Sequence, residues 1–147
     1  MPLRTKRWND PVEADDGFRL LVCRYRPRGV SKARETWDEW WPDLGPSRAL
    51  HAAYWGKGEA DEEQHAGKGL PWPAYRLRYL EEMQRQSFRL RALAGRHAAG
   101  ETITLLCSSA CEDPERCHRT VLAELVSGLA SRAGGGGPAG KRRTDRP

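Results

Sequence analysis

The sequence predicts a small single domain of the α/β class, with a mostly parallel sheet flanked by helices. Two short segments, Phe18–Cys23 and Thr102–Cys107, are apolar along most of their length and are bounded by turn residues, as buried strands are. Continuous rather than alternating apolarity indicates parallel strands that are covered on both faces. Helical patterns separate and follow these strands, and 147 residues suffice for one domain with its own core.

Five helices are expected around the strands, each from apolar residues spaced three and four apart. The first is expected from Ser31 to Leu44, where the tryptophans recur at helical spacing and are expected in the core: Trp37, Trp40, Trp41. A short second helix is expected after Ser47, which can cap it. The remaining helices are expected from Trp72 to Met83, from Phe88 toward Gly100, and at Cys117–Leu129. The glycine-rich segment 56–70 is expected to be a surface loop.

Most of the basic charge lies at the end of the chain. The net charge is +5, and residues 131–147 hold five Lys or Arg and one acid, which leaves +1 for the rest. The sequence therefore predicts an α/β domain at 1–130 and a disordered, basic, glycine-rich tail at 131–147. Such a tail can make weak, salt-sensitive contacts with nucleic acid, but its charge says little about the folded part.

The composition also bears on the cellular compartment. No apolar segment is long enough to form a transmembrane helix, and no secretory signal is visible behind Met1, so no membrane partner is expected. Four cysteines in such a chain are expected to be free thiols in the cytoplasm rather than disulfides.

A group of arginines follows the first expected strand. Arg24, Arg26 and Arg28 alternate, so an extended backbone would point them to one side, and Gly29 lets the chain turn or approach a ligand closely. Ligands of open α/β sheets bind at the carboxyl ends of strands, and guanidinium groups bind carboxylates and phosphates. These four residues are therefore candidate ligands for an anion, although salt bridges to acidic side chains are an equal alternative.

A second group follows the second expected strand and leads into a helix. Cys117, His118 and Arg119 are expected in or near its first turn, with Cys107 at the end of the strand. The positive end of a helix favours an anion and lowers the pKa of a thiol. Cys117 and His118 are therefore the candidate catalytic residues, with Cys107 and Arg119 as ligand-binding candidates. A buried, inert Cys117 is the alternative.

Cysteine spacing raises the question of a metal. Cys107 and Cys111 have a spacing found in zinc sites, and Cys117 with His118 could complete four ligands. Adjacent side chains at a helix start are expected to diverge, however, so neither a metal nor another cofactor is predicted. A redox disulfide among the cysteines remains an alternative.

Five ordered motifs resemble the YeaO-like proteins, the family called domain of unknown function 488. They lie at residues 24–32, 37–47, 72–82, 104–107 and 117–119, and the resemblance extends from about Leu3 to Leu129. It implies a small α/β domain and no established activity. The recurrent polar residues of the family correspond here to Arg24, Pro27, Arg28, Gly29, Cys107, Cys117, His118 and Arg119. Three positions depart from the family pattern: Cys23, Arg26 and the additional Cys111.

Three functions are compatible with these residues. The leading hypothesis is a cytoplasmic protein with an anion site, acting as an enzyme on a phosphorylated or carboxylated small molecule or on a nucleic-acid end. The same arginines without turnover would make a binding module for an anion or nucleic acid. The cysteines alone would make a metal or redox module.

Overall fold

The sheet at the centre of the computed structural model, which describes residues 3–56 and 69–135, has four parallel strands. Its order is β1-β4-β2-β3, and the strands are β1 (Leu3–Arg7), β2 (Phe18–Leu21), β3 (Glu39–Trp40) and β4 (Ile103–Cys107). Every residue of β4 is buried, because β4 pairs with β1 on one side and β2 on the other. This placement accounts for its continuous apolar sequence, and the expected α/β class is confirmed.

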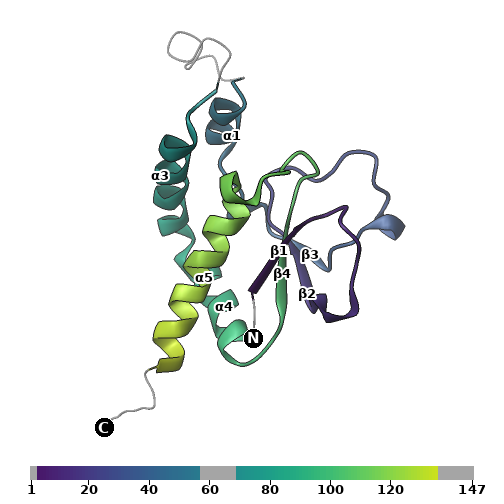
Figure 1. Ribbon diagram of the computed structural model, residues 1–147, viewed down its shortest axis with the longest axis vertical. Coiled ribbons are helices and arrows are strands. Elements are labelled where there is room, and N and C mark those ends of the chain that lie inside the picture. The colour runs from purple at the N-terminus through teal and green to yellow at the C-terminus, as the bar shows by residue number, and fades with distance from the viewer. Residues whose placement is uncertain (1–2, 57–68, 136–147) are drawn as a thin grey trace.

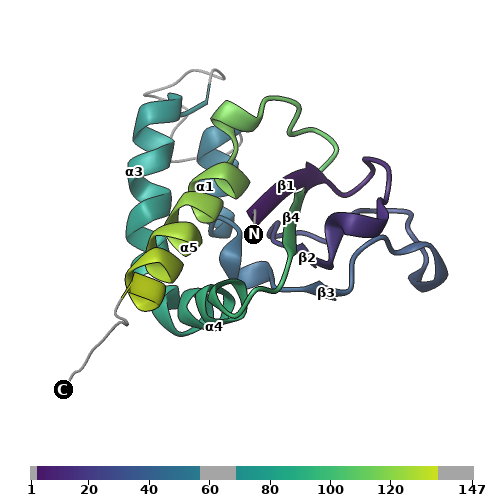
Figure 2. The ribbon, with the colours of Figure 1, turned by 60° about the horizontal axis from the view of Figure 1, so that its bottom comes forward.

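The long helices gather on one side of the sheet (Figures 1 and 2). They are α1 (Arg48–Tyr54), α3 (Trp72–Met83), α4 (Ser87–Ala98) and α5 (His118–Gly135). Leu20 and Leu105 from the sheet pack with Leu93 and Leu122 from the helices in the main core. Four of the five expected helices are therefore confirmed. None of the described helices is both long and apolar enough to cross a membrane.

Irregular segments, rather than helices, cover the opposite face of the sheet. Trp37 is 7% exposed and belongs to a second apolar cluster with Leu21 and Leu106. The rings of Trp8 and Trp37 meet edge to face with their centroids 6.1 Å apart. Large aromatic side chains thus supply the second covering layer that a buried parallel sheet requires.

The prediction of a helix from Ser31 to Leu44 is wrong. The chain instead makes two short 3-10 turns, Lys32–Arg34 and Pro42–Leu44, with β3 between them. The tryptophans of this segment point to opposite faces of the sheet, since Trp41 packs against the main core and Trp37 and Trp40 against the second cluster. Adjacent side chains such as Trp40 and Trp41 point to opposite faces along a strand but not along a helix, and Trp37 precedes β3.

Strand β1 was not expected, because its sequence is mostly polar. Its basic side chains are held by acidic residues just before β2, where Lys6 Nζ lies 2.8 Å from Asp16 Oδ1. Asp16 is 1% exposed and also binds Arg19. Burial opposes the charged form of Asp16, but hydrogen bonds from Lys6 and the Glu13 amide outweigh it and lower the pKa of this carboxyl.

Two expected segments lie mostly outside the described residues. The surface loop expected at 56–70 is described only at its ends, and the tail expected at 131–147 only up to residue 135. Residues 131–135 belong to α5, which continues past Leu129 to Gly135.

Candidate functional site

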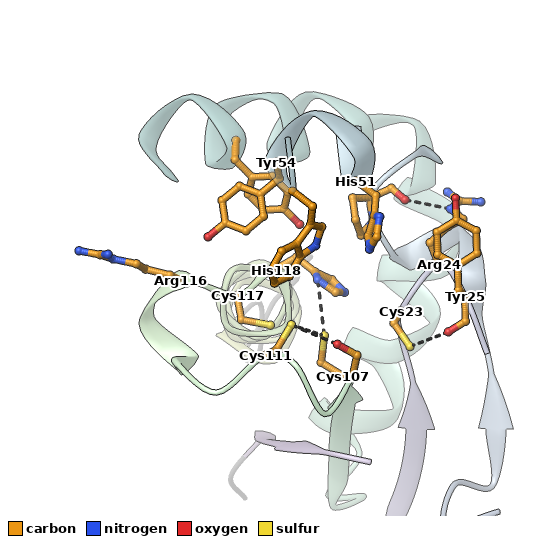
Figure 3. Close-up of a pocket in the computed structure, with 14 residues that line it drawn as sticks. Cys23, Arg24, Tyr25, His51, Tyr54, Cys107, Cys111, Arg116, Cys117 and His118 are labelled. Atoms are coloured by element: carbon orange, nitrogen blue, oxygen red, sulfur yellow. Dashed lines mark hydrogen bonds between the residues drawn. The ribbon is translucent and has the colours of Figure 1, made fainter. Parts of the chain in front are cut away.

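A pocket with a volume of about 70 Å³ lies at the carboxyl ends of β2 and β4 (Figure 3). This is the edge at which open α/β sheets bind ligands. Its walls come from the segment after β2, from α1 and α3, and from the chain between β4 and α5. The lining residues that matter most below are Arg24, His51, Tyr54, Cys107, Cys111, Arg116, Cys117 and His118.

Three thiols converge at the floor of the pocket and form the thiol cluster, defined as Cys107, Cys111 and Cys117. Their sulfur atoms all lie within 4.8 Å of one another. Cys107 Sγ donates a hydrogen bond to Cys111 Sγ at 3.3 Å, and Ser108 Oγ donates to the same sulfur at 3.5 Å. Cys107 and Cys117 are 1% and 2% exposed, whereas Cys111 is only half-buried. Cys111 is therefore the sulfur of the cluster that a molecule in the pocket can reach.

The backbone at Cys117 directs its side chain into the thiol cluster, while the next residue, His118, contacts Cys107. Cys117 has φ −136° and ψ 140°, an extended conformation, and the helix begins only at His118. The helical turn in which the two side chains were expected to diverge therefore begins after Cys117. Cys117 Sγ joins the cluster, and His118 Nδ1 lies 3.8 Å from Cys107 Sγ.

The protonation of His118 follows from its hydrogen bond. Its Nε2 lies 2.8 Å from the carbonyl oxygen of Val22, which can only accept, so Nε2 carries the proton. Burial lowers the pKa of His118 despite this hydrogen bond, so the ring is neutral. Its Nδ1 therefore presents a lone pair to the thiol cluster. The ring of Tyr79 packs edge to face against it, with centroids 5.4 Å apart.

The three thiols of the cluster differ in their pKa values. Hydrogen bonds from Cys107 and Cys117 lower the pKa of the Cys111 thiol and outweigh its burial. The hydrogen bonds with Cys111 and Cys117, together with burial, raise the pKa of Cys107. For Cys117, the hydrogen bond with Cys107 lowers the pKa, but that with Cys111 and burial raise it to about 12. The low pKa expected for Cys117 is therefore wrong, and Cys111 has it instead.

Two arginines flank the pocket without pointing into it. Arg24 is positioned by the carbonyl of Pro46, which accepts from its Nε at 2.9 Å, and its Nη1 lies 3.6 Å from Asp43. Gly45 permits this arrangement, because a Cβ there would lie only 2.5 Å from the Arg24 amide nitrogen. Arg116 extends away from the sulfur atoms in Figure 3. Its side chain is 69% exposed.

The structure brings four of the sequence-derived site residues together and leaves four outside the pocket. Arg24, Cys107, Cys117 and His118 line it; Arg26, Arg28, Gly29 and Arg119 do not. Arg26 pairs with Glu35 at 2.8 Å and lies over the ring of Trp37, while Arg28 and Gly29 are exposed. Arg119 is 5% exposed, and its Nε and Nη1 have no hydrogen-bond partner among the described residues.

Several pocket residues were not singled out from the sequence. His51 and Arg116 were not among the candidate site residues, yet both line the pocket with Tyr54. The three-residue spacing of His51 and Tyr54 was the available signal, since it places both on neighbouring positions of one helix. Nothing in the sequence indicated which way that helix would face.

In the described part of the chain, the thiol cluster is a group of potential metal ligands without a basic partner, and His118 Nδ1 lies 3.8 Å from one of its sulfurs, that of Cys107. The acidic group of Glu13, Asp15 and Asp16 also has ligand geometry. Those carboxylates, however, are already paired with Arg4 and Lys6.

Comparisons with known proteins agree with the motifs. A family model described as the active DUF488-N3 subclade matches residues 3–128. The chain is 31% identical over 129 residues to the uncharacterized protein YeaO of Escherichia coli K12, covering 88% of this chain and 100% of that protein. It is 29% identical over 128 residues to the uncharacterized proteins Rv3073c of Mycobacterium tuberculosis and Mb3100c of Mycobacterium bovis, covering 86% of this chain and 94% of each of theirs. No solved structure matches.

Proposed function

The chain belongs to the YeaO-like DUF488 family, and on that premise we propose that it is an enzyme in which the Cys111 thiolate attacks the phosphoryl or carbonyl centre of a small anionic ester or anhydride held in the pocket, displaces its alcohol or acid, and is regenerated when water hydrolyses the resulting thioester or thiophosphate. The observation that carries the proposal is the position of Cys111. It is the half-buried member of a thiol cluster whose other two members are almost fully buried. The description of the family model as an active subclade agrees with an enzyme.

The surroundings of Cys111 favour its thiolate form, which is the nucleophilic form of cysteine. Cys107 and Ser108 both place a donor on its sulfur, at 3.3 and 3.5 Å. The first turn of α5 begins one residue after Cys117, so the positive end of that helix faces the cluster. In this proposal Cys117 and His118, the catalytic candidates of the sequence, position Cys111 and do not attack the substrate themselves.

Size and charge support a small anionic substrate. A volume of about 70 Å³ is far below the several hundred Å³ of a drug-sized pocket but accommodates a phosphate or carboxylate group. Arg24 and Arg116 lie on its walls, and their charges favour an anion even though both guanidiniums point elsewhere in the unliganded protein. All four cysteines are free thiols, which agrees with a reducing compartment such as the cytoplasm.

The proposal is tested by comparing two alkylating reagents with the same reactive carbon and different charges. Iodoacetate is an anion and iodoacetamide is neutral, so the ratio of their rate constants at Cys111 isolates the effect of charge. In metal-free, reduced protein we expect Cys111 to be alkylated first and iodoacetate to be favoured. Arg24→Ala and Arg116→Ala should each lower the ratio several-fold, whereas Arg28→Ala, outside the pocket, should leave it unchanged.

Turnover is tested separately with a panel of small phosphate and carboxylate esters and anhydrides. Multiple turnovers that are lost in Cys111→Ser and kept in Cys23→Ser would support the enzyme. Protection of Cys111 by inorganic phosphate without any turnover would favour the binding module instead. Alkylation of Cys23 before Cys111 would overturn the assigned nucleophile.

A further inference from the structure

We propose that the thiol cluster and Nδ1 of His118 form a tetrahedral binding site for Zn²⁺ at the floor of the pocket. The metal site goes beyond the proposed function and does not depend on it; only the effect of zinc on activity rests on the proposed function. The two make opposite use of Cys111, since a sulfur bound to zinc is not free to attack a substrate. Zinc would therefore hold the pocket in an inactive state.

The three sulfurs, and His118 Nδ1 relative to Cys107, lie near the separations that zinc requires. With Zn–S bonds of about 2.3 Å and Zn–N bonds of about 2.0 Å, tetrahedral geometry places neighbouring ligand atoms about 3.5 to 3.8 Å apart. The Cys107 and Cys111 sulfurs are 3.3 Å apart, and Cys107 Sγ is 3.8 Å from His118 Nδ1. Cys117 Sγ lies within 4.8 Å of both other sulfurs. The three sulfurs are thus already gathered, and on zinc binding the His118 ring must move toward Cys111 and Cys117, because His118 Nδ1 is not within 4.8 Å of all three sulfurs.

His118 already has the environment of a metal-bound histidine. Metal-ligating imidazoles usually donate their second ring N–H to a carbonyl or carboxylate, which fixes the tautomer and the ring orientation. Here Nε2 donates to the Val22 carbonyl at 2.8 Å, and this bond leaves the Nδ1 lone pair facing the sulfurs. Among the described residues, the hydrogen that faces this lone pair is the Cys107 S–H, at the long distance of 3.8 Å and in competition with Cys111.

Zinc would also compensate the negative charge that the cluster acquires when its three thiols ionise. Three buried thiols cannot all ionise without a cation, because each further thiolate would be added beside the first. Zn²⁺ displaces their protons on binding, and with three thiolates and a neutral imidazole the site carries one negative charge. The N-terminus of α5 lies against that charge and stabilises it. Cys111, on the open side, gives the ion a path from the pocket.

The test is a Co²⁺ titration of the full-length, reduced protein after removal of metals by a chelator. Tetrahedral thiolate coordination gives Co²⁺ strong visible d–d bands and a sulfur-to-metal charge-transfer band in the near ultraviolet. We expect one equivalent to saturate both signals and Zn²⁺ to abolish them by displacement. Elemental analysis of the zinc-loaded protein should give one zinc per chain.

Two single substitutions identify the ligands. Cys111→Ser should weaken metal binding by at least about tenfold, and the half-buried position should tolerate the hydroxyl. Cys23→Ser is the matched control, because Cys23 lines the same pocket but donates to the Tyr25 carbonyl and lies outside the cluster. It should bind cobalt as the wild type does.

Three outcomes would overturn the site. They are a folded wild-type protein that binds no cobalt, an octahedral cobalt spectrum, and metal binding that Cys23→Ser abolishes but Cys111→Ser does not. The metal site and the enzyme can also fail separately. Tetrahedral cobalt binding without charge-selective alkylation would support the zinc site and contradict the proposed enzyme. Charge-selective alkylation without cobalt binding would contradict the zinc site and leave the proposed enzyme standing.

Discussion

Two polar clusters are buried in the described part of the protein, and they are built on opposite principles. In the first, the Asp16 carboxylate is bound by Lys6, Arg19 and the Glu13 amide, so its negative charge is matched by fixed positive groups. In the second, the thiol cluster, sulfur atoms share protons mainly with one another and the neighbouring lone pair of His118 is left nearly unused. Matched charges make the first cluster a source of stability. Incomplete pairing leaves the second able to exchange protons or bind an ion.

Removing the Asp16 charge should have the largest effect on stability. Asp16→Asn leaves Lys6 and Arg19 without their buried counter-ion, and breaking such a pair costs about 3 kcal/mol or more. The free energy of unfolding, measured by urea denaturation, should fall by this amount. Asp15→Asn is the control, because Asp15 is 66% exposed in its pair with Arg4 and its loss should cost far less than that of Asp16. Equal losses of stability in the two variants would contradict the special role of the buried Asp16 carboxylate.

The contribution of Asp16 should also depend on pH with a definite sign. The folded protein lowers the pKa of this carboxyl below the value of about 3.9 in unfolded chains. Its stabilisation is therefore complete above that value and is lost as the pH falls through the folded pKa. The stability difference between wild type and Asp16→Asn should be constant from pH 7 to pH 5 and shrink below about pH 4. A stability difference that grew as the pH fell would contradict a lowered pKa of Asp16 in the folded protein.

Oxidation should act on the thiol cluster and spare the rest of the molecule. Hydrogen peroxide oxidises a thiolate to a sulfenic acid, which condenses with a second thiol to give a disulfide and water. Cys107 and Cys111 should form that disulfide, since their sulfurs are 3.3 Å apart. Mass spectrometry should show the loss of two hydrogens and a peptide linking these residues. Closing so short a loop should stabilise the protein by at most about 2 kcal/mol; a link through Cys23 would contradict the geometry.

The smallest effect is expected at Tyr79, which lies between the main core and the pocket. Its hydroxyl donates to the Leu44 carbonyl at 2.7 Å, and burial raises the pKa of Tyr79 far enough to keep this donor protonated. Tyr79→Phe should cost about 1 kcal/mol by losing one buried hydrogen bond. The ring against His118 remains, so cobalt binding should not change. A change in cobalt binding would show that the hydroxyl, and not the ring, supports the imidazole.

Elements with strong local signals were predictable from the sequence. Helix α1 begins where Ser47 caps it, with Ser47 Oγ accepting from the Leu50 amide at 3.1 Å. Strand β4 is apolar because it is buried on both faces. Strands β1 and β3 were not predictable by the same means, since distant partners create them: Asp16 holds the charges of β1, and β2 supplies the pairing for β3.

The candidate site was predictable to the level of its segments and not of its side chains. The rule that strand ends share one edge of a sheet places the chain after β2 beside the chain after β4, where Arg24 and Cys107 line one pocket. The direction of Arg26 depends on Glu35 and Trp37, which belong to another segment. The direction of Cys117 depends on one extended residue before α5. Neither dependence is visible in residue spacing.

The buried cysteines have a further consequence for measuring motion in this protein. Cys23, Cys107 and Cys117 stand at the end of β2, the end of β4 and the start of α5, and each is less than a tenth exposed. A thiol reagent can reach each of them only when its own element opens. In metal-free protein, the labelling rate of each thiol divided by that of an unfolded thiol gives the opening equilibrium of that element. The chain therefore carries three native cysteines that report local unfolding around one pocket, and no cysteine has to be introduced to measure it.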